Sequence, residues 1–264
     1  MNQAHPIVNP ELIAFAEHLA DQAGDIARRY FRQHVSTQQK ADLSPVTQAD
    51  QEIEKAIQDL IRFHYPEHGI IGEELGVHNP GAAWQWVIDP IDGTRSFIAG
   101  YPIFTTLIAL THQGIPLLGI IDQTINKERW VAVPGRPTLC KGNPVKTLTH
   151  TALSDVVIAT TSTYYFNKKE AAAFETLRAQ CSGTQLGGDA YGYAMVANGL
   201  LGLMVDTGLK PYDFCAIKPV IESAGGIITD WQGNSITLHS DGRIIAAANA
   251  KLHAQALTIL QTAI

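Results

Sequence analysis

The stretch Trp86-Val87-Ile88-Asp89-Pro90-Ile91-Asp92-Gly93-Thr94 joins an apolar strand to two acids and a turn. Pro90 has no backbone N–H donor and a fixed φ, so the chain has to leave the strand sharply after Asp89. This exit allows Asp89 and Asp92 to turn toward one point. It also leaves the carbonyl of Ile91 without an obvious partner in the ladder of the sheet.

The end of the same stretch, Asp92-Gly93-Thr94, favours a turn. Such a turn leaves consecutive backbone N–H groups free, and these suit a phosphate oxygen. Taken alone, the stretch fits two structures equally well. One is an Asx turn that caps a helix, and the other is a metal site.

Further acids stand at the ends of other apolar segments. Gly72-Glu73-Glu74 follows an apolar strand, and Asp213 heads an apolar-periodic helix, where an isolated Asp is most simply an N-cap. Carboxylates that share a site raise one another's pKa unless a cation neutralises them. Oxygen ligands of this kind suit Mg²⁺ or Mn²⁺. The acids together therefore predict a metal-dependent enzyme that acts on phosphate.

The composition limits the class of protein. With 264 residues, 45% hydrophobic and 17% charged, the chain can bury a large core, which excludes intrinsic disorder. A net charge of −6 argues against a nucleic-acid partner. Residues 1–10 lack the pattern of a signal peptide, and the most apolar run, Phe104 to Leu110, is too short to span a membrane. We therefore expect a cytoplasmic protein with neither a nucleic-acid partner nor a membrane contact.

The hydrophobic periodicity predicts mixed helices and strands, which indicates an α+β or layered αβ architecture. Helices are expected at 11–33, 48–64, 168–181, 189–199, 213–224 and 250–264. Strands are expected at 70–71, 86–88, 103–110, 117–121, 130–133, 155–160, 201–205, 227–230 and 244–248. The strands between 70 and 133 are expected to form an antiparallel meander with turns at 111–114 and 124–127, and 36–46 is a loop or hairpin. A boundary near 142–154 divides the single unit 1–264 into an N-terminal half, 1–145, and a C-terminal half, 146–264.

Four blocks of the chain, in order and spacing, resemble the inositol monophosphatase superfamily of lithium-sensitive phosphatases. The blocks are Asp42-Leu43-Ser44-Pro45-Val46-Thr47-Gln48-Ala49-Asp50, Ile71-Gly72-Glu73-Glu74, the stretch 86–94, and Tyr212-Asp213 followed by Glu222-Ser223-Ala224-Gly225-Gly226. The third block is highly specific, whereas the second would be weak alone. The resemblance covers about residue 10 to the C-terminus.

The resemblance implies an αβαβα sandwich of the inositol monophosphatase and fructose-1,6-bisphosphatase type, in a homodimer. It implies two or three Mg²⁺ ions, for which Mn²⁺ can substitute. The implied metal ligands are Glu73, Asp89, the Ile91 carbonyl, Asp92 and Asp213.

The implied catalytic residues are Thr94 and Asp50, which orient and activate the attacking water, together with Glu73. Gly93 and Thr94 would bind phosphate through their backbone N–H groups. Because phosphoryl transfer depends mainly on positioning and charge neutralisation, no Cys or His nucleophile is required.

The substrate has to be inferred from residues outside the metal set. Tyr212 and the segments 187–194 and 95–100 resemble the bacterial histidinol-phosphate phosphatase branch. Histidinol phosphate carries an ammonium group and an imidazole, so additional acids suit it, and Asp189 and Asp206 are the candidates. Helix capping is the alternative for Asp189, and a solvated strand end is the alternative for Asp206.

The sequence therefore predicts a Mg²⁺-dependent histidinol-phosphatase of histidine biosynthesis. An inositol-1-phosphatase or a broad sugar-phosphate phosphatase is the second interpretation. A catalytically idle regulatory member of the family is the third. The presence of the whole implied ligand set argues against the third.

Overall fold

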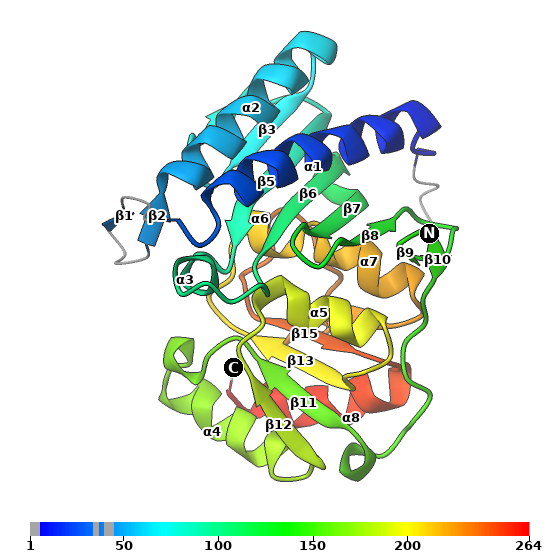
Figure 1. Ribbon diagram of the computed structural model, residues 1–264. Helices are drawn as coiled ribbons and strands as arrows, with labels where there is room; N and C mark the ends of the chain where they lie inside the picture. Colours follow the sequence, from blue (N-terminus) through cyan, green and yellow to red (C-terminus); the bar gives the residue numbers. More distant parts are fainter. Residues whose placement is uncertain (1–5, 34–36, 40–44, 264) are drawn as a thin grey trace.

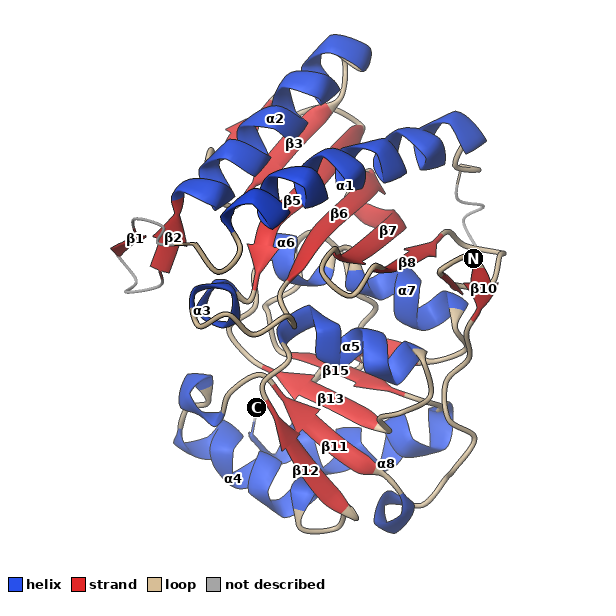
Figure 2. Ribbon diagram, in the orientation of Figure 1, coloured by secondary structure: helices blue, strands red, loops and turns tan. Residues whose placement is uncertain are grey.

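The computed structural model has five layers that alternate between helices and sheets (Figure 1). It describes residues 6–33, 37–39 and 45–263. The two sheets are separated by a layer of helices and covered by helices on their outer faces, as the colouring in Figure 2 shows. This arrangement confirms the predicted layered α+β sandwich.

The first layer contains α1 (Pro10–Tyr30) and α2 (Gln48–His64), and α2 has the predicted bounds. Thr47 caps α2, because its hydroxyl accepts from the amide of Ala49 while the carboxylate of Asp50 accepts from the amide of Thr47. Before it, β1 (Thr37–Gln39) and β2 (Pro45–Thr47) pair antiparallel, which confirms the hairpin alternative for this region. The part of the first block from Asp42 to Ser44 lies outside the described residues.

The second layer is a sheet of eight strands. In spatial order these are β10 (Asn143–Pro144), β9 (Leu139–Cys140), β8 (Glu128–Ala132), β7 (Ile115–Gln123), β6 (Thr105–His112), β5 (Trp84–Asp92), β3 (Gly69–Gly72) and β4 (Val77–His78). The predicted meander holds from β5 to β8, but β3 pairs parallel with β5, so the prediction is wrong there. The parallel pairing has a consequence for the site. It brings the C-terminal ends of β3 and β5 to the same place, beside Glu73 and Asp89.

Successive side chains along β5 alternate between its two faces, and this alternation places Asp89 toward the interior of the molecule. Trp86 and Ile88 pack in the core cluster under α1 and α2, whereas Val87 packs in the cluster that contains the middle helices. Because successive side chains point to opposite faces, Asp89 lies on the same face as Val87. Asp89 therefore faces the middle helix layer.

The middle layer contains α5 (Asp189–Ala197), α6 (Pro211–Phe214) and α7 (Ile217–Ser223). The sequence predicts one helix over 213–224, and the structure has two. Pro219 cannot donate the hydrogen bond that would continue the helix across Cys215. The segment also packs tightly on β7, where a Cβ at Gly119 would lie 2.0 Å from the carbonyl oxygen of Ala216. Glycine at that position therefore allows the segment that carries Asp213 to approach the sheet.

The remaining layers belong to the C-terminal part of the chain. The second sheet has the order β12 (Gly183–Leu186), β11 (Val157–Thr160), β13 (Leu203–Asp206), β15 (Ile244–Ala247) and β14 (Ile227–Asp230). Its outer face is covered by α4 (Lys168–Arg178) and α8 (Ala250–Leu260). Short 3₁₀ turns occur at Leu153–Asp155, Thr163–Tyr165 and Gln261–Ala263. Within the described residues, no helix has the length and apolar character needed to cross a membrane.

Candidate metal centre

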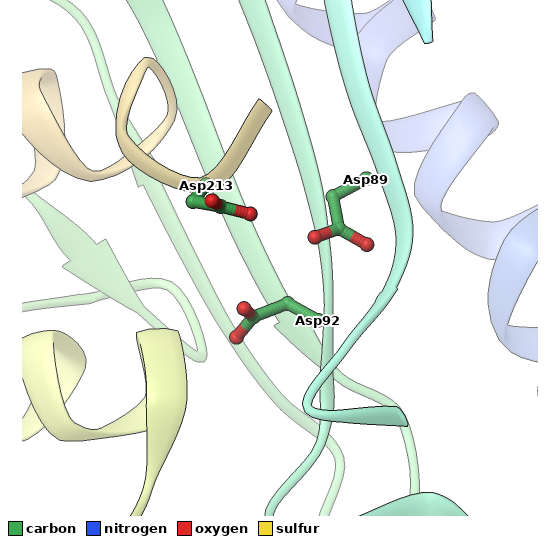
Figure 3. Close-up of side chains that lie close together, drawn as sticks. All are labelled: Asp89, Asp92 and Asp213. Atoms are coloured by element: carbon green, nitrogen blue, oxygen red, sulfur yellow. The ribbon is translucent and has the colours of Figure 1, made fainter. Parts of the chain in front are cut away.

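Three carboxylates meet between the large sheet and the middle helices. Asp89, Asp92 and Asp213 each offer one oxygen, and these oxygens lie within 4.8 Å of one another. Figure 3 shows the side chains turned toward a common point, two from β5 and its end and one from the short helix α6. The structure thus brings together three of the five predicted metal ligands.

Asp89 is the most deeply buried of the three acids. Its exposed fraction is 2%. Burial raises the pKa of Asp89 well above its ordinary value, and the charges of Glu73, Asp92 and Asp213 raise it further. Its Oδ1 is buried and has no hydrogen-bond partner among the described residues. A buried carboxylate oxygen with no hydrogen-bond donor is the kind of oxygen that a bound cation would satisfy.

Local hydrogen bonds hold the other two carboxylates in place. Asp92 Oδ2 accepts from the amide of Ala190 at 2.6 Å, and Asp213 Oδ2 accepts from the amide of Lys210 at 2.6 Å. Burial raises the pKa of Asp92 well above its ordinary value and that of Asp213 to about 7. Asp213 is the third residue of α6, and Lys210 is the N-cap, so the N-cap interpretation of Asp213 is wrong.

Glu73 lies beside these three acids. It is not one of the set whose oxygens lie within 4.8 Å of one another. Its amide donates to the carbonyl of Ile88 at 3.2 Å, next to Asp89, and its charge raises the pKa of both Asp89 and Asp213. The charge of Glu73 therefore acts on the cluster, and its role as a metal ligand stays a prediction.

The carbonyl of Ile91 is outside the ladder, as its sequence context predicts. The pairing of β5 with β6 steps from Asp89 to Asp92 through an irregularity. However, the hydroxyl of Thr94 donates to the Ile91 oxygen at 3.1 Å, so this carbonyl does have a partner. A carbonyl oxygen has two lone pairs, which leaves one for a further contact.

Of the two predicted water-orienting residues, Thr94 follows Asp92 by two positions, and Asp50 is near enough to Glu73 for that charge to raise its pKa. Thr94 begins α3 (Thr94–Ile98), a short helix that the periodicity does not reveal. Asp50 Oδ2 accepts from the amide and the hydroxyl of Thr47, while Asp50 Oδ1 is buried and has no hydrogen-bond partner among the described residues. Burial raises the pKa of Asp50 to about 6. Their role in catalysis stays a prediction.

A pocket of about 700 Å³ opens beside the cluster. Glu73, Asp92 and Asp213 line one part of it. The other lining residues include Arg95, Tyr164, Tyr165, Asp189, Tyr193, Asp206, Lys210 and Tyr212. Sequence reasoning missed the tyrosines at 164 and 165 and gave Arg95 no role of its own within the segment 95–100, because exposed side chains on very short helices give no periodic signal.

Asp189 adopts a strained backbone conformation at the pocket. Its φ is +45°, and it follows Gly187 and Gly188, whose φ values are also positive. Such strain in a residue other than glycine is often found at functional sites. Asp189 is the first residue of α5, and Gly188 is the N-cap, so Asp189 is not the cap itself. Burial raises the pKa of Asp189 to about 6, as does the charge of Asp206, while Arg95 lowers it.

The carboxylate of Asp206 is buried and hydrogen-bonded within the protein. It is 3% exposed, so the alternative of a solvated strand end is wrong. Its two oxygens accept from the hydroxyl of Thr160, the amide of Thr161 and the hydroxyl of Tyr193 at 2.8–2.9 Å. A direct contact between Asp206 and a substrate would have to compete with these donors. A substrate contact by Asp189 or by Asp206 stays a prediction, and both acids line the pocket.

Magnesium is expected to raise the midpoint of thermal unfolding by about 5–10 °C when present at ~100 times its Kd. Binding at that level contributes about 2.7 kcal/mol, and 1 kcal/mol moves the midpoint of a chain of this size by roughly 2–4 °C. At one fixed Mg²⁺ concentration, the rise should be larger at pH 8 than at pH 5.5. The pKa of Asp213 is about 7 in the metal-free folded protein, whereas its ordinary value is 3.8. Between these two values, the folded protein keeps a proton that the unfolded chain has lost. Its stability therefore falls as pH rises through this window, and a cation has fewer protons to displace at higher pH.

Thermal scans with MgCl₂, and with KCl at equal ionic strength as the control, test this expectation. A midpoint that does not respond to Mg²⁺, or a rise that is the same at both pH values, would contradict it.

Known proteins are similar to this chain in both sequence and fold. A sequence model of the inositol monophosphatase family matches residues 9–264. The bifunctional phosphatase IMPL2, chloroplastic, of Arabidopsis thaliana is 42% identical over 94% of this chain and 74% of its own length. A histidinol-phosphatase of Chlorobaculum parvum is 34% identical over 92% of this chain and 94% of its own.

Among solved structures, an inositol monophosphatase from Zymomonas mobilis superposes with a TM-score of 0.89 and 43% identity. The superposition covers 97% of this chain and 100% of the other. The family match spans nearly the whole chain, and three of the acids that the family resemblance singled out, Asp89, Asp92 and Asp213, converge in the fold. The chain belongs to the inositol monophosphatase family of magnesium-dependent phosphatases.

Proposed function

We propose that the chain hydrolyses histidinol phosphate to histidinol and phosphate in histidine biosynthesis. The proposal rests on the composition of the pocket wall beside the three clustered acids. It combines the carboxyl group of Asp189 with the exposed aromatic rings of Tyr164 and Tyr165. A carboxylate pairs well with a substrate ammonium group, and aromatic rings stack on an imidazole. The relative from Chlorobaculum parvum, named a histidinol-phosphatase, supports the same substrate.

In this proposal the chain's own residues hold and orient the phosphate ester. Glu73, Asp89, the Ile91 carbonyl, Asp92 and Asp213 would hold the cations. Bound Mg²⁺ would neutralise charge on the phosphoryl oxygens and lower the pKa of nearby water. The backbone N–H groups of Gly93 and Thr94, at the start of α3, have no partner within the helix and would bind phosphate oxygens. Thr94 and Asp50 would orient the attacking water, and the carboxylate of Asp50 would receive its proton.

Glycine at 93 has a geometric reason in the structure. Its φ is +83°, and a Cβ there would lie 2.7 Å from Oδ2 of Asp189. The phosphate-binding turn and the proposed substrate-selecting acid are therefore neighbours. A phosphate held at Gly93 would leave the alcohol part of the ester within reach of Asp189.

A second function, inositol-1-phosphatase or broad sugar-phosphate phosphatase, is favoured by the likeness to the Zymomonas mobilis inositol monophosphatase. A substrate panel separates the two functions. The panel contains histidinol phosphate, inositol-1-phosphate, fructose-1,6-bisphosphate and 3′-phosphoadenosine 5′-phosphate, each measured with Mg²⁺. A higher kcat/KM for inositol-1-phosphate than for histidinol phosphate would replace the first proposal with the second.

Asp189→Asn is expected to lower kcat/KM for histidinol phosphate by roughly ten- to a hundred-fold. The reason is the loss of a charge-assisted hydrogen bond of about 1.5–3 kcal/mol, at 1.4 kcal/mol per decade. Turnover of glycerol 2-phosphate should change little, because that substrate has no cation to lose. Steady-state kinetics on both substrates provide the measurement. Equal losses on both would indicate a general defect and would contradict the role of Asp189.

Three further features stay predictions. These are a homodimer, a cytoplasmic location, and a count of two or three Mg²⁺ ions with Mn²⁺ as a substitute. Sedimentation and metal analysis of the purified protein would test the first and the third.

A further inference from the structure

Glu54 is a fully buried carboxylate on α2, one helical turn after Asp50. Its Oε2 accepts from the amide of Glu74 at 2.7 Å, and its Oε1 accepts from the amide of Leu75 at 2.8 Å. Oε1 also accepts from the side chain of Gln58 at 2.9 Å. The carboxylate thus binds the backbone of the loop that follows β3, directly beyond Glu73.

The same loop is tied down on its other side. The amide of Gly72 donates to the carbonyl of Gly76 at 3.0 Å, and the amide of Glu73 donates to the carbonyl of Ile88 at 3.2 Å. A Cβ on Gly72 would lie 1.8 Å from Oε1 of Glu54, so only glycine allows the carboxylate to come this close. The backbone of Glu73 is therefore held between α2 and β5.

Burying the Glu54 carboxylate has a cost in folding free energy. A carboxylate removed from water loses its hydration, and the loss is offset only when donors replace the water. Burial raises the pKa of Glu54, and the amide donors of Glu74 and Leu75 oppose that rise. An apolar side chain on α2 would avoid the desolvation, but it would leave these two loop amides without their acceptor.

We propose that Glu54 is a positioning residue for the metal centre. It holds the 72–75 loop so that the Glu73 carboxylate is presented to the cation site beside Asp89 before any cation binds. The inference rests on the proposed role of Glu73 as a metal ligand. Groups that orient metal ligands through hydrogen bonds typically change metal affinity by about 10–100-fold when they are replaced.

Two variants and a matched control test the role of Glu54. Glu54→Asp keeps the charge but shortens the side chain, so it cannot reach both amides. Glu54→Gln keeps the length but places an amide donor against a loop donor. Glu52→Gln is the control, because it removes the same charge from the same helix while its neighbours are Arg29 and Tyr30. The Kd for Mn²⁺, measured by calorimetry on the metal-free protein, should rise about 10-fold or more in both Glu54 variants and less than about 2-fold in the control.

The outcomes separate positioning from charge. Normal Mn²⁺ affinity in Glu54→Asp together with weak binding in Glu54→Gln would show that only the charge matters, and would overturn the proposal. Normal affinity in both would overturn it as well. Glu73→Gln is measured beside them. If this variant binds Mn²⁺ as the wild type does, the metal role of Glu73 fails instead.

Amide hydrogen exchange tests the proposal even if the variants do not fold. In the metal-free wild type, the amides of Glu74 and Leu75 should be strongly protected, because their acceptor is the Glu54 carboxylate, which is in place without any cation. Adding Mn²⁺ should change their exchange rates little. Exchange at the rate of an unstructured chain before Mn²⁺ is added would overturn the proposal.

Discussion

Replacing Asp89 by Asn is expected to lower kcat/KM by at least ~10²-fold at saturating Mg²⁺. Asp89 is buried beside Asp92 and Asp213, and one of its oxygens has no hydrogen-bond partner among the described residues. An amide of the same shape carries no charge and binds a cation more weakly, so the electrostatic stabilisation of the transferring phosphoryl group is lost. Steady-state kinetics over a range of MgCl₂ concentrations provide the measurement. Near-normal activity at saturating Mg²⁺ would contradict the metal assignment.

The stability of Asp89→Asn serves as the control for this experiment. Burial and neighbouring charges raise the pKa of Asp89 well above its ordinary value, which means that its ionised form opposes folding. Without metal, the variant should therefore unfold at the same temperature as the wild type or at a higher one. The difference should be larger at pH 8 than at pH 5.5. A marked loss of stability would instead attribute the lost activity to misfolding.

Thr94→Ala is expected to lower kcat by about 10²-fold while KM changes little. The hydroxyl of Thr94 donates to the carbonyl of Ile91, which ties the proposed water-orienting group to a proposed metal ligand. Removing it should affect the transition state more than the bound substrate. Steady-state kinetics with histidinol phosphate and with glycerol 2-phosphate should show the same loss, because the group acts on the phosphate and not on the alcohol.

Thr94→Ser is the matched variant, since it keeps the hydroxyl and removes only a methyl group. It should recover most of the lost kcat. An effect of Thr94→Ala on KM alone would assign Thr94 to uniform phosphate binding. Failure of the serine variant to recover activity would show that the methyl packing, and not the hydroxyl, matters.

Much of the local structure follows from short-range chemistry. The bounds of α2 are encoded by the cap at Thr47 and by the stop near Pro66 and Gly69, all within a few residues of the helix ends. The turn between β6 and β7 is encoded in the same way, by a glycine at position 114 with φ +77°. The exit of the chain after Asp89 follows from the proline beside it. Such features depend on neighbours in sequence, so the sequence predicts them correctly.

Features that depend on distant contacts could not be predicted. The apolar residues of β3 do not predict its parallel pairing with β5, because either direction would bury them. In the fold, β4 lies between the two strands in sequence and pairs antiparallel with β3, so the chain then enters β5 in the direction of β3. Asp206 resembles a solvated strand end in the sequence, yet Thr160, Thr161 and Tyr193 surround it in the fold. Glu54 stands among the apolar positions of α2, and the two backbone amides that it accepts from, those of Glu74 and Leu75, belong to the loop that follows β3.

The identity of the acids could therefore be inferred from the chain, whereas their meeting point could not. The motifs around Asp89 and Asp92 predict carboxylates that turn together, because Pro90 restricts the backbone between them. Asp213 joins them only because the segment around Ala216 packs directly on β7 at Gly119. Long-range packing of this kind sums many weak contacts from separate layers, so no short stretch of sequence contains it.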